Sequence, residues 1–378
     1  MRAIELFAGA GGLGIGVSRA GFRPEIIVER DRWCCETLRK NNAFGWPEPL
    51  ERDIREIDFR STGKPATIVT GGPPCQPFSL GGKHAAHADR RDMWPEAVRV
   101  VREARPKAFI FENVRGLTRQ TFATYLSYIL LQLQHPSVAK HLDEKWTDHL
   151  ARLEGHHTGG GEIEYRVLHH VLDAADFGVA QRRHRVVFVG FRSDVKAGWS
   201  FPPATHSKEA LAWAQRPGGE YWDRHRIPRK QQHLALSQPS HAPSELPWAT
   251  VRDALVGLPD PRSKASEEWL NHRFQPGARS YPGHTGSPID LPAKALKAGV
   301  HGVPGGENML REPDGSVRYF SIREAARLQA FPDDWELHGS WSEAMRQIGN
   351  AVPTTLGQVI ATSVKQHLDR QKRKSALT

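Results

Sequence analysis

The sequence predicts an α/β protein built on a parallel sheet, with a smaller loop-rich region, and three observations support this. Short apolar runs alternate with helical patterns over the first 190 residues, as expected for repeated strand–helix–strand units. A glycine-rich turn, Gly9–Gly14, follows the first run and opens a helix. Proline then becomes dense, because residues 193–320 hold 15 of the 27 prolines. That density excludes long helices and central strands, so short β pieces are expected there.

Six apolar runs of strand length are the expected strands. They are Ala3–Phe7, Glu25–Glu29, Thr67–Thr70, Ala108–Glu112, Tyr165–Val171 and Arg185–Gly190. Residues 120–164 are expected to add a helical hairpin. Helical pattern resumes after Ser321, where Glu324 completes a capping box. A last helix is expected from about Thr354 to Asp369, followed by a frayed basic tail.

The length of 378 residues suggests two domains. We expect a catalytic and cofactor-binding domain over 1–192, with the helical insertion at about 120–164. Residues 193–320 are expected to form a second domain, and 321–378 to return to the first.

The net charge of +10 and the pI near 9.6 favour a polyanionic partner, because Lys and Arg displace the counterions of phosphates. Charge alone does not separate a nucleic-acid-binding protein from a merely basic enzyme. The apolar runs are too short to span a bilayer, and no signal peptide precedes the first strand. Three cysteines are too few for a disulfide framework, so we expect a reducing cytoplasm and no membrane.

The stretch Gly71–Ser79 displays a single thiol, Cys75, at the end of a predicted strand. Two glycines and two prolines hold the chain off helical geometry just before this thiol. A cysteine presented by such a rigid turn is a candidate nucleophile.

The turn Gly9–Gly14 fits Gly-x-Gly-x-x-Gly between a strand and a helix, where the backbone can approach a nucleotide closely. Glu29 ends the second strand and can accept the ribose hydroxyls of such a ligand. These features indicate an adenosine-containing cofactor but do not separate NAD from S-adenosylmethionine.

Glu29, Cys75 and Glu112 all follow predicted parallel strands at their carboxyl ends, the edge where ligands bind in open α/β sheets. If the strand at Arg185 begins early, Gln181, Arg183 and Arg185 share one face. Two guanidiniums there could orient a carboxylate or bind a carbonyl oxygen.

With these residues in place, the chain resembles the bacterial cytosine-5 DNA methyltransferases of the restriction-modification type. The matching blocks, in the family's order, are Phe7–Gly14, Glu29, Asp53–Ile54, Gly71–Ser79, Glu112–Val114, Gln181–Arg185, Arg323–Gln329 with Phe331–Asp333, and Gln347–Pro353. The resemblance implies a Rossmann-like sheet that binds S-adenosylmethionine and, over 193–320, a smaller loop-rich, β-containing target recognition domain.

The resemblance also implies a covalent mechanism on a flipped-out cytosine. Cys75 would add to carbon 6, which makes carbon 5 nucleophilic. Glu112 would protonate or hydrogen-bond ring nitrogen 3, and Arg185 would hold the carbonyl oxygen and Glu112, with Arg183 in support. The base that removes the carbon-5 proton is not identified.

The implied cofactor is S-adenosylmethionine, leaving as S-adenosylhomocysteine, and no metal is expected, because His84 and His87 lack further ligands. Its methionine and ribose ends would lie against the glycine turn and Glu29, and its adenine against Asp53 and Ile54. The full implied set is Phe7, Gly9, Gly11, Gly12, Leu13, Gly14, Glu29, Asp53, Ile54, Pro74, Asn350 and Val352. At Met93–Trp94 the chain departs from the family, which has a smaller aliphatic residue there, so Trp94 is not in the set.

The implied partner is double-stranded DNA, with a cognate restriction endonuclease in the same system and a monomeric enzyme as further expectations. Aromatic and basic residues interleave over Tyr221–Arg226, and Arg229, Lys230, Arg273, Arg279 and Tyr281 add to them. The nearest alternative is a tRNA cytosine-5 methyltransferase, against which the long block 193–320 argues. An NAD-dependent oxidoreductase would leave Cys75 and Gln181–Arg185 without a role. A catalytically inactive DNA-binding protein is disfavoured because the nucleophile, the acid and the arginines are all present.

Overall fold

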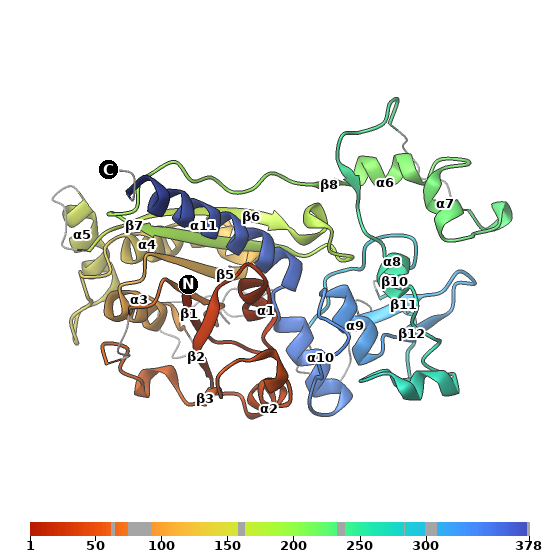
Figure 1. The fold of residues 1–378 in the computed structure, drawn as a ribbon, viewed down its shortest axis with the longest axis horizontal. Helices are drawn as coiled ribbons and strands as arrows, with labels where there is room; N and C mark the ends of the chain where they lie inside the picture. The colour runs from red at the N-terminus through yellow and green to blue at the C-terminus, as the bar shows by residue number, and fades with distance from the viewer. Residues whose placement is uncertain are drawn as a thin grey trace. The chain divides into compact units, whose positions relative to one another are not determined.

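The computed structural model describes residues 1–61, 65–74, 92–157, 163–232, 239–282, 284–298 and 308–375. The chain forms two compact units (Figure 1). The first comprises residues 1–172, 184–201 and 357–378, and the second comprises 173–183 and 202–356. These units follow contacts within the fold, so the functional division at 193 and 320 stays a prediction.

A seven-stranded sheet forms the centre of the first unit, in the order β3-β2-β1-β4-β5-β7-β6. The strands are β1 (Arg2–Leu6), β2 (Arg23–Glu29), β3 (Leu50–Glu51), β4 (Ile68–Gly71), β5 (Ala108–Val114), β6 (Tyr165–Asp173) and β7 (His184–Arg192). All six expected strands are present. The expectation of a parallel sheet was wrong in one respect, since β7 runs antiparallel to β5. The sheet is therefore mixed.

Helices cover both faces of this sheet. They are α1 (Gly12–Arg19), α2 (Arg32–Lys40), α3 (Trp94–Ala104), α4 (Ala123–Gln134), α5 (Trp146–His157) and α11 (Thr354–Ser375). On one face Trp94 of α3 packs edge-on against Phe111 and Phe188. On the other, α11 lies along β7 (Figure 1), where His367 contacts Phe191. The helix α11 runs to Ser375, so the frayed tail expected after Asp369 was wrong.

The central strands are close-packed because their side chains alternate between the two faces. Phe109, Phe111 and Phe188 are fully buried in one core. Gly190 has no room for a side chain, since a Cβ there would lie 2.1 Å from the Phe109 ring. This packing gives the carboxyl ends of β4 and β5 a rigid support.

The insertion at 120–164 contains a pair of contacting helices, α4 and α5, as expected. His149 joins them: its Nδ1 lies 2.7 Å from the Tyr128 hydroxyl and its Nε2 2.8 Å from the Val138 carbonyl. A carbonyl only accepts, so Nε2 carries the proton and Nδ1 accepts from Tyr128. Burial lowers the pKa of His149.

This buried histidine predicts a loss of stability in mild acid. Below its unfolded pKa of about 6.5, the unfolded chain binds a proton that folded His149 excludes, so unfolding becomes easier as pH falls toward the folded pKa. Partial desolvation also lowers the pKa values of His169 and His206, so these two residues act in the same direction. The melting temperature should be lower at pH 5.5 than at pH 7.5. The substitution His149→Gln should reduce this difference, whereas His141→Gln, at an exposed histidine, should not. An unchanged difference in His149→Gln would contradict the assignment.

The second unit is built from short elements, as the proline density predicted. Its strands are β8 (His206–Ser207), β9 (Leu246–Pro247), β10 (Ser287–Pro288), β11 (Met309–Arg311) and β12 (Val317–Tyr319). Its α-helices are α6 (Lys208–Ala214), α7 (Glu220–Arg224), α8 (Val251–Leu255), α9 (Ile322–Leu328) and α10 (Trp341–Asn350). The chain also forms short 3-10 turns: Asn42–Phe44, Ile54–Glu56, Arg115–Thr118 (η5), Gln120–Phe122, Ala174–Phe177, Arg229–Gln231 and Lys264–Glu268.

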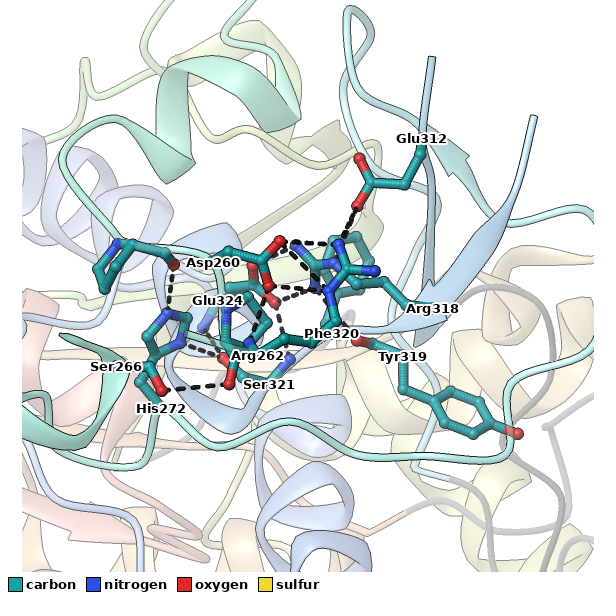
Figure 2. Close-up of polar contacts among 12 residues, drawn as sticks. Asp260, Arg262, Ser266, His272, Glu312, Arg318, Tyr319, Phe320, Ser321 and Glu324 are labelled. Carbon is teal, nitrogen blue, oxygen red and sulfur yellow. Dashed lines mark hydrogen bonds and ion pairs between the residues drawn. The ribbon is translucent and has the colours of Figure 1, made fainter. Parts of the chain in front are cut away.

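The capping box at the start of α9 is present and belongs to a larger buried network (Figure 2). Ser321 Oγ accepts from the Glu324 N–H at 3.1 Å and lies 2.7 Å from His272 Nδ1. Glu324 receives two hydrogen bonds of 2.7 Å from Arg318, whose Nε bonds Glu312. Since buried charges must be paired, this network fixes the position of the connection between β12 and α9.

Candidate functional site

Glu112 and Arg185 form an ion pair at the carboxyl edge of the sheet. In the antiparallel ladder Glu112 faces Val187 and Arg185 faces Val114, so the two charged residues are diagonal neighbours on one face. Their side chains are only 10% and 12% exposed. The turn after β4 passes close by, since a Cβ on Gly72 would lie 3.2 Å from Glu112 Oε2. The predicted acid and one predicted arginine are therefore together.

The turn that leads to Cys75 is held by backbone contacts. A Cβ on Gly71 would lie 2.5 Å from the Leu6 carbonyl, so only glycine fits there. Asn113 Nδ2 donates to the Pro73 carbonyl at 2.9 Å, and the Met93 N–H donates to the Pro74 carbonyl at 3.4 Å. The turn is thus tied to the strand of Glu112. Cys75 itself, with Ser79 and His84, lies outside the described residues.

The other two thiols are poor nucleophiles. Cys34 and Cys35 are buried on α2. Burial, aided by the nearby Glu29 carboxylate, raises the pKa of Cys35 to about 12. A thiol must ionise to attack, so Cys35 is a poor nucleophile, and burial keeps Cys34 away from a substrate.

The glycine turn has the backbone geometry of a ligand cradle. Gly9 and Gly11 have φ values of 55° and 87°, in the left-handed region that favours glycine. Phe7 also has a positive φ, 52°, which is unusual for a residue with a side chain. A Cβ on Gly14 would lie 2.8 Å from the Trp46 ring. The remaining members, Gly12 and Leu13, are buried in the first turn of α1.

Glu29 holds this turn in place. Its Oε2 accepts the Gly9 N–H at 2.8 Å, and its Oε1 accepts the N–H groups of Arg30 and Asp31, both at 2.8 Å. A carboxylate has about four acceptor positions. About one position is left for a ribose hydroxyl, rather than the two that the sequence suggested.

Asp53 and Ile54 lie after β3 and have different environments. Partial burial raises the pKa of Asp53, but hydrogen bonds from Arg55 outweigh it, so the pKa lies below its ordinary value. Asp53 is therefore an ionised acceptor at neutral pH. Ile54 is 3% exposed and belongs to the hydrophobic core. Little of its surface is available to an adenine ring.

Arg183 lies in the second unit and is buried, with 1% of its surface exposed. It donates to the carbonyls of Leu296 at 3.0 Å and Gly349 at 2.6 Å. The strand β7 begins at His184, so Arg183 and Gln181 do not extend it as expected. Gln181 donates instead to the Leu328 carbonyl. Arg183 therefore organises the backbone around it. Asn350 and Val352 also lie in the second unit, and their role stays a prediction.

Two carboxylates near the site were not identified from the sequence. Asp173 accepts from the backbone N–H of Arg183 at 2.8 Å and from the Arg182 guanidinium. Asp92 accepts hydrogen bonds from the N–H of Trp94, the first residue of α3, and from the Tyr125 hydroxyl. Only their closeness in sequence to the Gln181–Arg185 and Gly71–Ser79 blocks could have indicated a role for them. Trp94 is fully buried in the core.

The interleaved aromatics of the second unit are core residues, which corrects the idea that they face a partner. Tyr221 and Trp222 are 0% and 1% exposed and pack with Trp248. Arg224 pairs with Asp253, and Arg273 donates to backbone carbonyls. Among the described residues, exposed side chains that form no hydrogen bond or ion pair include those of Arg226, Arg229, Lys230 and Arg279.

The described residues hold neither a cluster of metal ligands nor a membrane-spanning helix. In those ranges, no His, Cys, Asp and Glu side chains gather in threes as a metal site requires. No helix in the same part of the chain has the length and apolar character to cross a membrane.

The first unit therefore defines an α/β nucleotide-binding enzyme with an acid–arginine pair at the sheet edge. The model of C-5 cytosine-specific DNA methylases matches residues 1–136 and 160–366. The chain belongs to this family and is a DNA (cytosine-5) methyltransferase of the bacterial restriction-modification type. Over 97% of its length it is 30% identical to type II methyltransferase M.PspPI of Psychrobacter sp., covering 79% of that protein.

Other relatives extend the match. The chain is 30% identical to type II methyltransferase M.FnuDI of Fusobacterium nucleatum, covering 100% of this chain and 98% of the relative. Its fold is similar to that of the Schizosaccharomyces pombe Dnmt2 methyltransferase, with a TM-score of 0.58 and 17% identity over 98% of this chain and 99% of that one. The family match favours DNA over the tRNA alternative.

Proposed function

We propose that this enzyme transfers a methyl group from S-adenosylmethionine to carbon 5 of a flipped-out cytosine in duplex DNA, through an adduct between Cys75 and carbon 6. The observation that carries the proposal is the buried Glu112–Arg185 pair beside the turn that leads to Cys75. A pyrimidine ring needs an acid at nitrogen 3 and a cation at its carbonyl oxygen when a nucleophile attacks carbon 6. This pair supplies both groups.

The chain's own groups account for the attack on carbon 6 and for the proton at nitrogen 3. Cys75 Sγ attacks as the thiolate, forming the S–C6 bond, while the Glu112 carboxyl donates a hydrogen bond or proton to nitrogen 3. Arg185 holds the ring oxygen and keeps Glu112 oriented. After carbon 5 receives its methyl group, a base removes the carbon-5 proton and the S–C6 bond breaks. Glu112 regains its proton, and Cys75 is free again.

The cytosine must leave the duplex for this chemistry, at a cost of a few kcal/mol. We propose that Arg183 is a positioning residue for this site. It bonds two carbonyls, its N–H is held by Asp173, and Arg185 follows two residues later. Residues 193–320 are proposed as the target recognition domain.

S-adenosylmethionine fits the cradle, because a left-handed glycine turn and the Glu29 side chain suit its methionine and ribose ends. When bound, it supplies an electrophilic methyl group. Glu29 offers its remaining acceptor position to a ribose hydroxyl, and Asp53 offers an ionised oxygen to the adenine amine. Phe7, Gly9, Gly11, Gly12, Leu13, Gly14, Ile54, Pro74, Asn350 and Val352 are proposed to complete the contact set.

Glu29→Gln should raise the KM for S-adenosylmethionine with a smaller effect on kcat. An amide oxygen cannot accept all three N–H groups, and charge-assisted hydrogen bonds contribute about 1.5–3 kcal/mol each, so a rise of about 10- to 100-fold in KM is expected. The matched control is Glu25→Gln, which changes a carboxylate at the opposite end of β2. A Glu29 variant with the parental KM would rule out its role at the cofactor.

The substrate is tested by methyl incorporation into duplex DNA and tRNA in parallel. Duplex DNA should accept the label, and a preference for tRNA would overturn the assignment. Bisulfite sequencing of DNA from cells that express the enzyme then identifies the methylated site. We further propose that the enzyme acts as a monomer in the bacterial cytoplasm and protects host DNA from a cognate endonuclease.

A further inference from the structure

The 3-10 turn η5 places two arginines immediately beyond the catalytic edge of the sheet. It begins at Arg115, three residues after Glu112, and Arg119 follows its last residue. Both side chains are exposed, and within the described ranges neither guanidinium has a hydrogen bond or an ion pair. Other arginines in the described part of this unit form ion pairs, including Arg39 with Glu36 and Arg192 with Asp194. Two unpaired cations therefore lie beside the proposed site.

The turn that carries these arginines is well anchored. Leu117, between them, is 0% exposed and belongs to the core. The Thr118 hydroxyl donates to the Arg115 carbonyl at 3.0 Å, and the Phe122 N–H donates to the Arg119 carbonyl at 2.8 Å. Because the backbone is held and only the guanidiniums project, binding an anion there would order little of the chain.

The same edge holds the turn that leads to Cys75. Asn113, two residues before Arg115, donates to the Pro73 carbonyl at 2.9 Å. A cytosine that reaches Glu112 and Cys75 brings its own backbone to this edge, with a phosphate on either side of it. Arginine matches phosphate in charge and in its planar array of donors.

We infer that Arg115 and Arg119 bind backbone phosphates flanking the flipped cytosine, an inference that rests on the proposed function. The contact is independent of base sequence and acts on affinity for duplex DNA. It assigns a role to a turn that none of the sequence motifs covered.

The test is the salt dependence of duplex binding by the full-length enzyme. Each phosphate contact contributes about 0.9 to the slope of log K against log salt concentration. The double variant Arg115→Ala/Arg119→Ala should therefore lower the slope by about 1 to 2 for a duplex that carries the methylation site. Arg115→Lys/Arg119→Lys should restore most of it, because lysine also binds phosphate as a point charge.

Arg23→Ala is the matched control, since Arg23 is an exposed arginine at the opposite, amino end of β2. It should keep the parental slope, and all variants should keep the parental melting temperature and KM for S-adenosylmethionine. Neutral methylphosphonates on both sides of the target cytosine should lower the affinity of the parent enzyme for the duplex. They should not lower the affinity of the alanine variant further.

A parental slope in the alanine variant overturns the phosphate contact, even where affinity falls, because a loss of affinity without a change of slope would indicate base recognition. Failure of the proposed function is distinguishable from these outcomes, because the parent enzyme itself would then methylate no duplex DNA.

Discussion

Cys75→Ala should abolish methyl transfer, lowering kcat by at least about 10⁴-fold, the order seen when a covalent nucleophile is removed from an enzyme. Without the thiolate, carbon 5 of cytosine has too little electron density to attack a methyl donor. Affinity for duplex DNA should stay close to the parental value, because contacts to the phosphates are unaffected. The measurements are methyl incorporation into duplex DNA and equilibrium binding of the same duplex.

Cys34→Ala is the matched control for this variant. Cys34 is a thiol that the structure buries on α2, so its loss should leave kcat near the parental value. A duplex with 5-fluorocytosine at the target provides a second measurement, because fluorine cannot leave carbon 5 as a proton does. The parent should then accumulate a stable protein–DNA adduct that Cys75→Ala cannot form. Turnover by Cys75→Ala comparable to the parent would refute the covalent mechanism.

Glu112→Gln should lower kcat by about 10²- to 10⁴-fold, the usual contribution of a general acid. An amide can hydrogen-bond ring nitrogen 3 but cannot give it a proton, so the negative charge produced by thiol attack is not neutralised. The KM for S-adenosylmethionine should change little. Single-turnover methylation with saturating DNA measures the chemical step directly.

The ion pair makes a second outcome testable. Glu112 and Arg185 contact each other, so their effects on kcat should not add, and the double variant Glu112→Gln/Arg185→Ala should be less impaired than the product of the single losses. Arg192→Ala, at the far end of β7 and paired with exposed Asp194, is the control and should keep parental kcat. Breaking a buried pair costs about 3–5 kcal/mol of stability, so melting temperatures must accompany the kinetics. Parental kcat in Glu112→Gln would remove this residue from the mechanism.

Local patterns account for the parts of the fold that were predicted. The six strands are runs of apolar side chains at strand length, and the helix after Ser321 starts at a residue whose hydroxyl caps the Glu324 N–H. In both cases the deciding interactions involve neighbours within a few positions. The glycine turn was predictable for the same reason, since only glycine tolerates its backbone angles without strain.

The features that the sequence did not predict depend on contacts between distant parts of the chain. The antiparallel direction of β7 depends on where the chain crosses between units, and no run of residues signals that. Tyr221 and Trp222 resemble a nucleic-acid-binding stretch because aromatics stack on bases, but aromatics also form cores, as these do with Trp248. The three N–H groups that Glu29 accepts are likewise visible only in the folded turn.

By itself the sequence determined the residue types of the chemistry: a thiol after a rigid turn, a carboxyl after a buried strand, and arginines near the start of another strand. Those features follow from strand length, backbone stiffness and side-chain reactivity, which are local properties. Only the tertiary structure decided that Arg185 pairs with Glu112 while Arg183 is buried among backbone carbonyls. The reason is that β5 and β7 come from distant parts of the chain, and their register alone determines which charges meet.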